Sequence, residues 1–275
     1  AVDLAGDGRS EVLVTSVARG RVISELRRWQ DNALKVAATI EGVYLRAAPR
    51  PAAPAVLLGQ RSGFDEVFAG RVEHYRLREK SFERVESSGL PRGTGIFGLA
   101  LAPEGSPVAL YALDRTGYIA AMTTEGKALW SSNRAFGGYP APLSAGELFG
   151  RGAFEEEGSE EKMRAFQGRL LAEPTTAGIR LVVPRNFSES LVTLPRQRAY
   201  GQGQIVIFEG PPESPEELLR SRAFDGYVAD LARADVDGDG KAEILFVVNS
   251  HAGIISGERG KLVAWRPASA SDKVK

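Results

Sequence analysis

Cysteine is absent from the 275-residue chain, so disulfide bonds, thiolate metal sites and cysteine nucleophiles are all excluded. Histidine occurs only twice, and neither copy lies in a sequence pattern typical of a catalytic triad or a zinc site. The sequence also contains no Gly-x-Ser-x-Gly elbow and no P-loop. We expect His74 to be a half-buried residue of a strand and His251 to lie in a loop.

Net charge and long hydrophobic runs are also missing. The 35 Lys and Arg residues balance the 35 Asp and Glu residues, so no overall field favours nucleic acid or an anionic membrane. No apolar run approaches the ~20 residues that a membrane-spanning helix needs. We therefore expect no nucleic-acid partner and no transmembrane segment. A content of 43% hydrophobic and 25% charged residues is typical of a folded globular protein.

The most specific motif is an acidic loop near the C-terminal end. Residues 235–243 read Asp-Val-Asp-Gly-Asp-Gly-Lys-Ala-Glu and continue into the apolar run Ile244–Val248. Alternating carboxylates converge on a hard cation when the chain curls, and Gly240 permits the sharp turn. An EF-hand would place its last acid at position 12 and continue into a helix, whereas Glu243 stands at position 9. The pattern predicts a calcium-binding loop between strands, and the alternative is a solvated Asp/Gly turn without metal.

The same pattern opens the chain at residues 3–11, before the apolar residues Val12–Val14. Three acids match the second loop in register: Asp3 with Asp235, Asp7 with Asp239, and Glu11 with Glu243. Ala5 stands where the second loop has Asp237. Because affinity in such loops depends on the number and charge of the ligands, we expect this first loop to bind calcium more weakly or to complete its shell with water.

A glycine-led β-type segment recurs along the chain, and an apolar β-type run precedes each copy. The glycines are Gly20, Gly70, Gly117, Gly203 and Gly260, separated by 50, 47, 86 and 57 residues. Most of these steps match the blade length of a β-propeller, in which each blade is a four-stranded sheet of roughly 40–55 residues.

We therefore predict an all-β fold, a single β-propeller domain over residues 1–275 with about five blades, although six or seven are also compatible. The predicted blades cover approximately residues 1–42, 43–91, 92–138, 139–225 and 226–275. Gly95–Leu101 and Gly226–Ala232 are predicted innermost strands.

The 86-residue step indicates insertions in the fourth blade, at residues 151–176 and 186–200, with a short helix near residues 162–167. The insertions combine an acidic stretch with the aromatic residues Phe154, Phe166, Phe187 and Tyr200. They are interpreted either as solvated loops or as a surface that recognises a partner.

The acidic loop between an inner strand and an apolar run resembles the FG-GAP/VCBS repeats of integrin-α-type β-propellers. In that family the loop between the first two strands of a blade binds calcium. The resemblance is strong over residues 235–248, fair over 3–15 and only architectural over 55–225. In the second loop it implies as ligands the side chains of Asp235, Asp237, Asp239 and Glu243 with the carbonyl of Lys241. In the first loop it implies the side chains of Asp3, Asp7 and Glu11 with the carbonyl of Arg9.

A weaker resemblance links Leu113–Gly117 and Glu125–Trp130 to the strand-closing phrases of quinoprotein-type propellers. It implies a Trp packed on an outer strand and no quinone cofactor. It also suggests a role as an outer-membrane assembly factor as a third, less favoured hypothesis.

The cofactor we expect is calcium, in a structural role. The favoured function is a non-catalytic binding or scaffold module that contacts a protein or glycan partner. Free calcium is scarce in the cytosol and the sequence begins without a signal peptide, so we expect a periplasmic, outer-membrane-associated or extracellular bacterial protein whose targeting segment lies outside this chain. The alternative is a carbohydrate-active enzyme, a polysaccharide lyase or glycoside hydrolase. An enzyme should show a channel lined by clustered groups with perturbed pKa values. Asp114, Asp225 and Asp230 are instead expected to be turn or capping residues.

Overall fold

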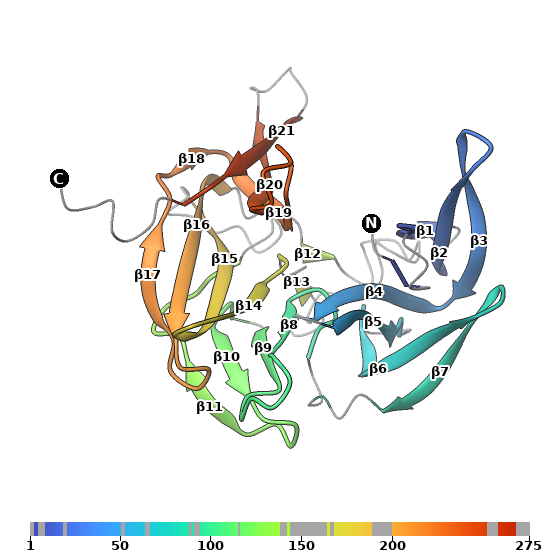
Figure 1. Cartoon of the computed structure of the whole chain (residues 1–275), viewed down its shortest axis with the longest axis horizontal. Coiled ribbons are helices and arrows are strands. Elements are labelled where there is room, and N and C mark those ends of the chain that lie inside the picture. The colour runs from blue at the N-terminus through green and yellow to red at the C-terminus, as the bar shows by residue number, and fades with distance from the viewer. Residues whose placement is uncertain are drawn as a thin grey trace, which may run out of the picture.

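The structure is a computed structural model of the chain. It describes residues 3–4, 9–18, 21–50, 53–63, 67–87, 90, 94–114, 116–137, 142–143, 164–165, 168–188, 200–251 and 258–267. Within these residues every regular element is a β-strand. Five sheets stand in a ring, as Figure 1 shows, and the fold is therefore the predicted five-bladed β-propeller.

Each blade is an antiparallel sheet whose strands follow one another in chain order. Blade 1 contains β1 (Val12–Ala18), β2 (Arg21–Gln30) and β3 (Ala33–Glu41). Blade 2 contains β4 (Val43–Arg50), β5 (Ala53–Arg61), β6 (Ala69–Arg78) and β7 (Ser81–Ser87). Blade 3 contains β8 (Leu99–Leu101), β9 (Leu110–Leu113), β10 (Ile119–Met122) and β11 (Ala128–Ser131).

Blade 4 contains β14 (Leu171–Thr175), β15 (Gly178–Ser188), β16 (Tyr200–Gly210) and β17 (Glu216–Arg220), and β18 (Phe224–Asp225) pairs with β16. Blade 5 contains β19 (Tyr227–Ala234), β20 (Glu243–His251) and β21 (Glu258–Trp265). The short strands β12 (Pro142–Leu143) and β13 (Arg164–Ala165) pair with each other.

Local sequence explains why the strands form where they do. In β2 the side chains of Val22, Ser24 and Leu26 are buried while their neighbours are more exposed, which is the alternation of a half-buried strand. β2 and β3 are joined by the two residues Asp31 and Asn32, whose φ angles are 50° and 59°. Asp and Asn tolerate this left-handed conformation, which a two-residue hairpin of this twist requires.

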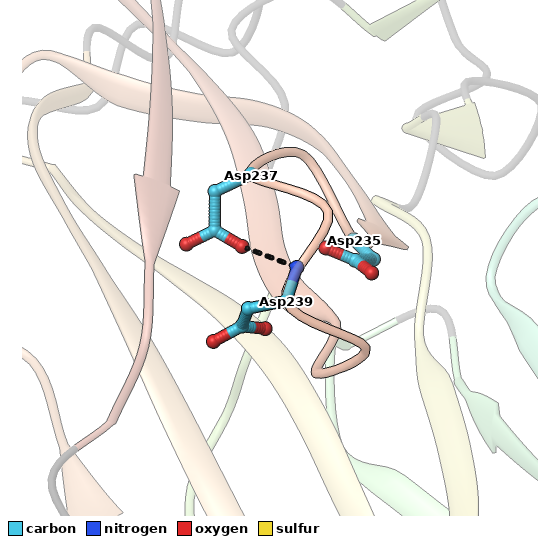
Figure 2. A group of neighbouring side chains, drawn as sticks. All are labelled: Asp235, Asp237 and Asp239. Carbon is cyan, nitrogen blue, oxygen red and sulfur yellow. Dashed lines mark hydrogen bonds between the residues drawn. The ribbon is translucent and has the colours of Figure 1, made fainter.

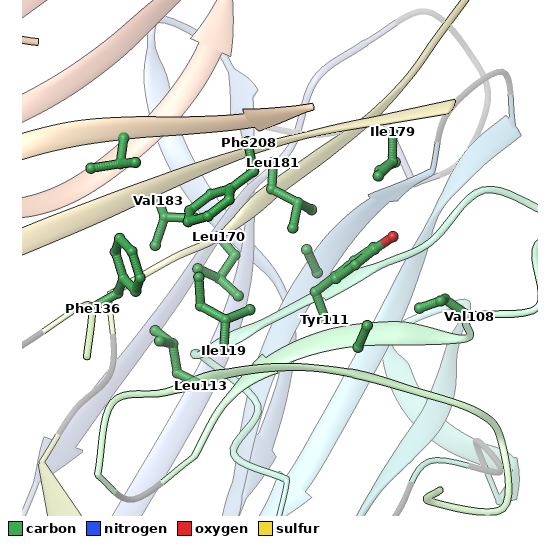
Figure 3. Close-up of a cluster of buried hydrophobic side chains, with 13 residues drawn as sticks. Val108, Tyr111, Leu113, Ile119, Phe136, Leu170, Ile179, Leu181, Val183 and Phe208 are labelled. Carbon is green, nitrogen blue, oxygen red and sulfur yellow. The ribbon is translucent and has the colours of Figure 1, made fainter. Parts of the chain in front are cut away.

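The hydrophobic core lies between neighbouring blades. Figure 3 shows the cluster between blades 3 and 4, where Tyr111 and Ile119 meet Leu181 and Phe208. Trp130 on the outer strand β11 packs edge-on against Phe208, with ring centroids 5.7 Å apart. The predicted packing of a Trp on an outer strand is therefore confirmed.

Polar clamps also tie neighbouring blades. Nη1 of Arg46 on β4 donates to the carbonyl oxygens of Ile96, Phe97 and Leu99 at 2.8, 2.7 and 2.9 Å, which ties blade 2 to blade 3. The side chain of Asn186 on β15 bonds both backbone groups of Val228 on β19, which ties blade 4 to blade 5. These side chains thus supply hydrogen-bond partners to backbone groups of the innermost strand of the next blade, or of the residues just before it, which that blade's own strands do not pair.

The fourth blade corrects three details of the sequence-based expectations. The first predicted insertion ends in β14, the innermost strand of that blade, so residues 171–175 belong to the repeat. The short helix near residues 162–167 is wrong at residues 164–165, which pair with β12 as the strand β13. Tyr200 is a buried residue of β16 and not a surface anchor, while Phe154 and Phe166 lie outside the described residues.

Candidate metal centre

The acidic loop 235–243 connects β19 to β20, the first two strands of blade 5, as predicted. Ala234 and Glu243 pair across the two strands, so the loop begins and ends at the last rung of the ladder. Gly238 and Gly240 have φ angles of 76° and 81°, a conformation that side chains with a Cβ rarely adopt. The chain can therefore fold back on itself within a few residues.

Three aspartates are neighbours in this loop, as Figure 2 shows for Asp235, Asp237 and Asp239. Their carboxylate oxygens lie within 4.8 Å of one another. Asp235 accepts hydrogen bonds from the amides of Gly238 and Gly240 at 2.7 and 2.8 Å. Asp239 accepts from the amide of Lys241 at 2.8 Å. The loop backbone thus holds the carboxylates in place.

Glu243 completes the acidic group from the first position of β20. Its side chain is part of the buried interior, since the residue is only 5% exposed. One carboxylate oxygen accepts a hydrogen bond from the amide of Val236 at 3.0 Å, across the mouth of the loop. The other oxygen forms an ion pair with Arg266, which follows β21.

The guanidinium of Arg266 lies among the predicted calcium ligands. Nη1 donates to Asp239 at 2.8 Å, and Nη2 donates to Asp237 and to the Lys241 carbonyl at 3.3 Å each, as well as to Glu243. One side-chain cation thus contacts four of the five groups that the resemblance implies. Asp235, the fifth, is held by the amides of its own loop.

Ionised carboxylates dominate the electrostatics of the loop. Hydrogen bonds from backbone amides lower the pKa of three of these acids. The main donors are the amide of Gly240 for Asp235, that of Lys241 for Asp239 and that of Val236 for Glu243. Arg266 lowers the pKa of Asp239 and Glu243 further, and its own pKa is raised by its bonds to them. Several ionised oxygens that converge on one cation fit calcium, which prefers six to eight oxygen ligands. Asp235, Asp237, Asp239, Glu243 and the Lys241 carbonyl would hold the ion.

The first loop repeats part of this geometry. Glu11 is 1% exposed and accepts a hydrogen bond from the amide of Leu4 at 2.9 Å, as Glu243 does from Val236. Its other oxygen pairs with Arg28 at 3.0 Å. Asp3 and Arg9 lie on either side of the loop, with Asp3 half-buried and Arg9 exposed, whereas Asp7 lies outside the described residues.

Arginine was not predicted at either loop. The arginine nevertheless stands at the same place in the strand register of both blades. Val12, which follows Glu11, pairs with Arg27, and Arg28 is the next residue. In the same way Ile244, which follows Glu243, pairs with Trp265, and Arg266 is the next residue. The sequence alone does not predict the contact between Arg266 and Glu243, because the two residues are 23 positions apart and the strand register brings them together.

Other residues singled out from the sequence have structural roles. His74 lies half-buried on β6, as predicted, whereas His251 is the last residue of β20 and not a loop residue. Asp114 caps a turn, since its carboxylate accepts from the amides of Thr116 and Tyr118 at 2.8 and 2.9 Å. The same expectation is wrong for Asp225 and Asp230, which lie in the strands β18 and β19, where Asp230 accepts a hydrogen bond from the amide of Leu231.

The acids on the innermost strands β4, β8, β14 and β19 are Glu173 and Asp230. Glu173 pairs with Arg233, and Asp230 pairs with Arg169 at 3.2 Å. Each of these two carboxylates is therefore held in an ion pair with an arginine.

A cavity of about 540 Å³ lies between blades 2 and 3, where the side chains of His74, Glu104 and Glu125 line it together with apolar residues. The hydroxyl of Thr124 donates to Glu125 at 2.6 Å and lowers the pKa of that carboxyl. A general acid requires the opposite shift, a raised pKa. The cavity therefore lacks this feature of a glycosidase site at Glu125.

No protein-family model and no curated protein sequence matches the chain. Among solved structures, a Bacteroides ovatus protein provisionally named a glycoside hydrolase is similar, with 12% sequence identity and a TM-score of 0.35. The similarity covers 92% of this chain and 86% of that one. In the part of the chain that the structure describes, no helix is long and apolar enough to cross a membrane.

Proposed function

We propose that this protein is a calcium-stabilised β-propeller that acts as a non-catalytic binding or scaffold module. Calcium is held between β19 and β20 by the side chains of Asp235, Asp237, Asp239 and Glu243 and by the carbonyl of Lys241. Such a loop suits a compartment where free calcium is plentiful, outside the cytosol of a bacterium. The partner is a protein or a glycan.

The observation that carries the proposal is that Asp235, Asp237 and Asp239 each place a carboxylate oxygen within 4.8 Å of those of the other two, in the loop between β19 and β20. The loop brings four carboxylates together with one guanidinium, that of Arg266, so repulsion among the carboxylates is only partly offset. A bound ion cancels that repulsion and ties β19 to β20. The role is therefore structural, and the ion stabilises the folded state in proportion to its binding free energy.

The acids outside this loop support a non-catalytic role. Glu173 and Asp230 on the innermost strands pair with arginines, and Glu125 in the cavity has a lowered pKa. No second function is proposed.

Thermal unfolding in EDTA and in calcium tests the proposal. At a calcium concentration of 100 times Kd the gain is about 2.7 kcal/mol, which for a domain of this size raises Tm by roughly 5–10 °C. Asp237→Ala and Asp239→Ala should each remove most of that gain. The matched control is Glu104→Ala, an exposed acid in the corresponding connection of blade 3. Identical melting curves of the wild-type protein with and without calcium would disprove the proposal.

A further inference from the structure

Arg266 directly follows β21 and contacts the acidic loop from a part of the chain that supplies none of the predicted ligands. Its Nη2 atom lies 3.3 Å from both Asp237 and the Lys241 carbonyl and also contacts Glu243. Nη1 lies 2.8 Å from Asp239. The guanidinium thus contacts four of the five predicted ligand groups, all except Asp235.

The same arrangement in blade 1 argues against an accidental contact. Arg28 stands at the position equivalent to Arg266 in the strand register and pairs with Glu11, the equivalent of Glu243. Both glutamates are buried, and a buried carboxylate without a positive partner is costly. Each blade therefore provides its own cation for the glutamate that begins the strand after the loop.

A guanidinium and a calcium ion cannot use these oxygens together. Calcium binds oxygen at 2.3–2.6 Å and needs six or more ligands around it. The same oxygens now accept hydrogen bonds from Arg266 at 2.8–3.3 Å, so the guanidinium fills the space that the ion would take. Two positive charges at one centre would also repel each other strongly.

We propose that Arg266 is a tethered cation that occupies the calcium position in the metal-free protein, so that calcium binds by displacing it. This inference rests on the proposed function. Arg266 holds the loop closed in the absence of metal. Calcium can bind only the molecules in which Arg266 has left the site, so the apparent affinity for calcium is the intrinsic affinity multiplied by the fraction of such molecules. The site then responds to calcium only above the concentration that the arginine sets.

Calcium affinity of the full-length chain tests the exchange. Titration calorimetry would compare the wild-type protein with Arg266→Met and with the matched control Lys241→Met. The control removes one positive charge from the same loop. It keeps the Lys241 carbonyl and leaves the guanidinium of Arg266 in contact with the predicted ligands. We expect Arg266→Met to bind calcium about tenfold more tightly or better, and Lys241→Met to gain much less.

Stability without calcium gives a second measurement. In EDTA, Arg266→Met should melt at a lower temperature than Lys241→Met, because its loop has lost the cation that contacts four ligands. Added calcium should then stabilise Arg266→Met more than the wild-type protein. A stable Arg266→Met protein in EDTA with unchanged calcium affinity would overturn the exchange.

The outcomes separate this inference from the proposed function. If calcium binds the wild-type protein and Arg266→Met equally well, the inference fails while the calcium site stands. If calcium binds only Arg266→Met, the exchange is supported and calcium binding by the wild-type protein fails. If neither protein binds calcium, both proposals are wrong.

Discussion

Two buried tyrosines differ in what their hydroxyl groups contact. Tyr111 is fully buried, and its hydroxyl donates to the carbonyl of Pro212 at 2.7 Å. Tyr44 is 3% exposed, and its hydroxyl has no hydrogen-bond partner among the described residues. A buried hydroxyl without a partner costs free energy, whereas a paired one is close to neutral or stabilising. The two residues should therefore respond oppositely to loss of the hydroxyl.

Replacement of each tyrosine by phenylalanine tests this difference. Tyr44→Phe should stabilise the protein by about 1 kcal/mol, because it removes an unsatisfied polar group. Tyr111→Phe should destabilise it by about 1–2 kcal/mol, because the Pro212 carbonyl loses its donor. Urea unfolding of both variants measures the change in free energy. Destabilisation by Tyr44→Phe would mean that its hydroxyl has a partner after all.

Tyr44 also predicts a pH dependence at the residue scale. Burial raises the pKa of Tyr44 to about 12 from a usual value near 10. A group whose pKa is raised by folding contributes stability that is fully present below pH 10 and is lost as the pH rises through about 12. The wild-type protein should therefore lose up to about 2–3 kcal/mol in this interval from Tyr44 alone. Tyr44→Phe should lose less, which urea unfolding at pH 9 and pH 11 would measure.

At the scale of elements, Arg46 joins the innermost strands of blades 2 and 3. Burial lowers the pKa of Arg46 to about 9, with a further lowering by Arg169. A buried cation is retained in this position because three carbonyl oxygens accept its bonds. β4 and β8 are thus coupled through a side chain rather than through a ladder.

Arg46→Met keeps much of the side-chain volume and removes the donors. We expect a loss of roughly 2–3 kcal/mol, since the carbonyl groups of Ile96, Phe97 and Leu99 lose their donor. Arg76→Met is the matched control, because Arg76 lies exposed on β6 and only pairs with Glu83 at the surface. Equal stability of both variants in urea would show that the clamp contributes nothing.

The strands of this fold could be predicted wherever hydrophobic periodicity was strong. The runs Ile179–Val183 and Ile244–Val248 became β15 and β20, since apolar β-branched residues fit a strand buried on both faces. β14 was missed because Leu171–Thr175 contains Glu and Pro and does not alternate. β13 was predicted as helix because its residues favour helix locally, and pairing with β12 overrides that preference.

The candidate site could be predicted only in part, for a related reason. All five predicted ligands of the 235–243 loop are close in sequence, so local spacing places them together. Arg266 enters from β21, and its position depends on the register between β20 and β21. Such a contact between distant residues cannot be found from spacing alone.

At the scale of the whole molecule, the two acidic loops lie in the first and last blades. Within the described residues these are the three-stranded blades, β1–β3 and β19–β21, whereas blades 2 and 3 have four strands. The proposed calcium ion joins β19 to β20, so its effect on stability should be largest in blade 5.

This distribution predicts where calcium acts on the ring. Removal of calcium should increase hydrogen exchange in β19–β21 most, to a smaller extent in β1–β3 where Ala5 replaces one acid, and least in β8–β11 of blade 3. Exchange measured by mass spectrometry in EDTA and in calcium provides the comparison, with Asp239→Ala as the variant that should not respond in β19–β21. A uniform increase over all five blades would instead mean that the ring opens as one cooperative unit, because the strands next to the loops would then be no weaker than the rest.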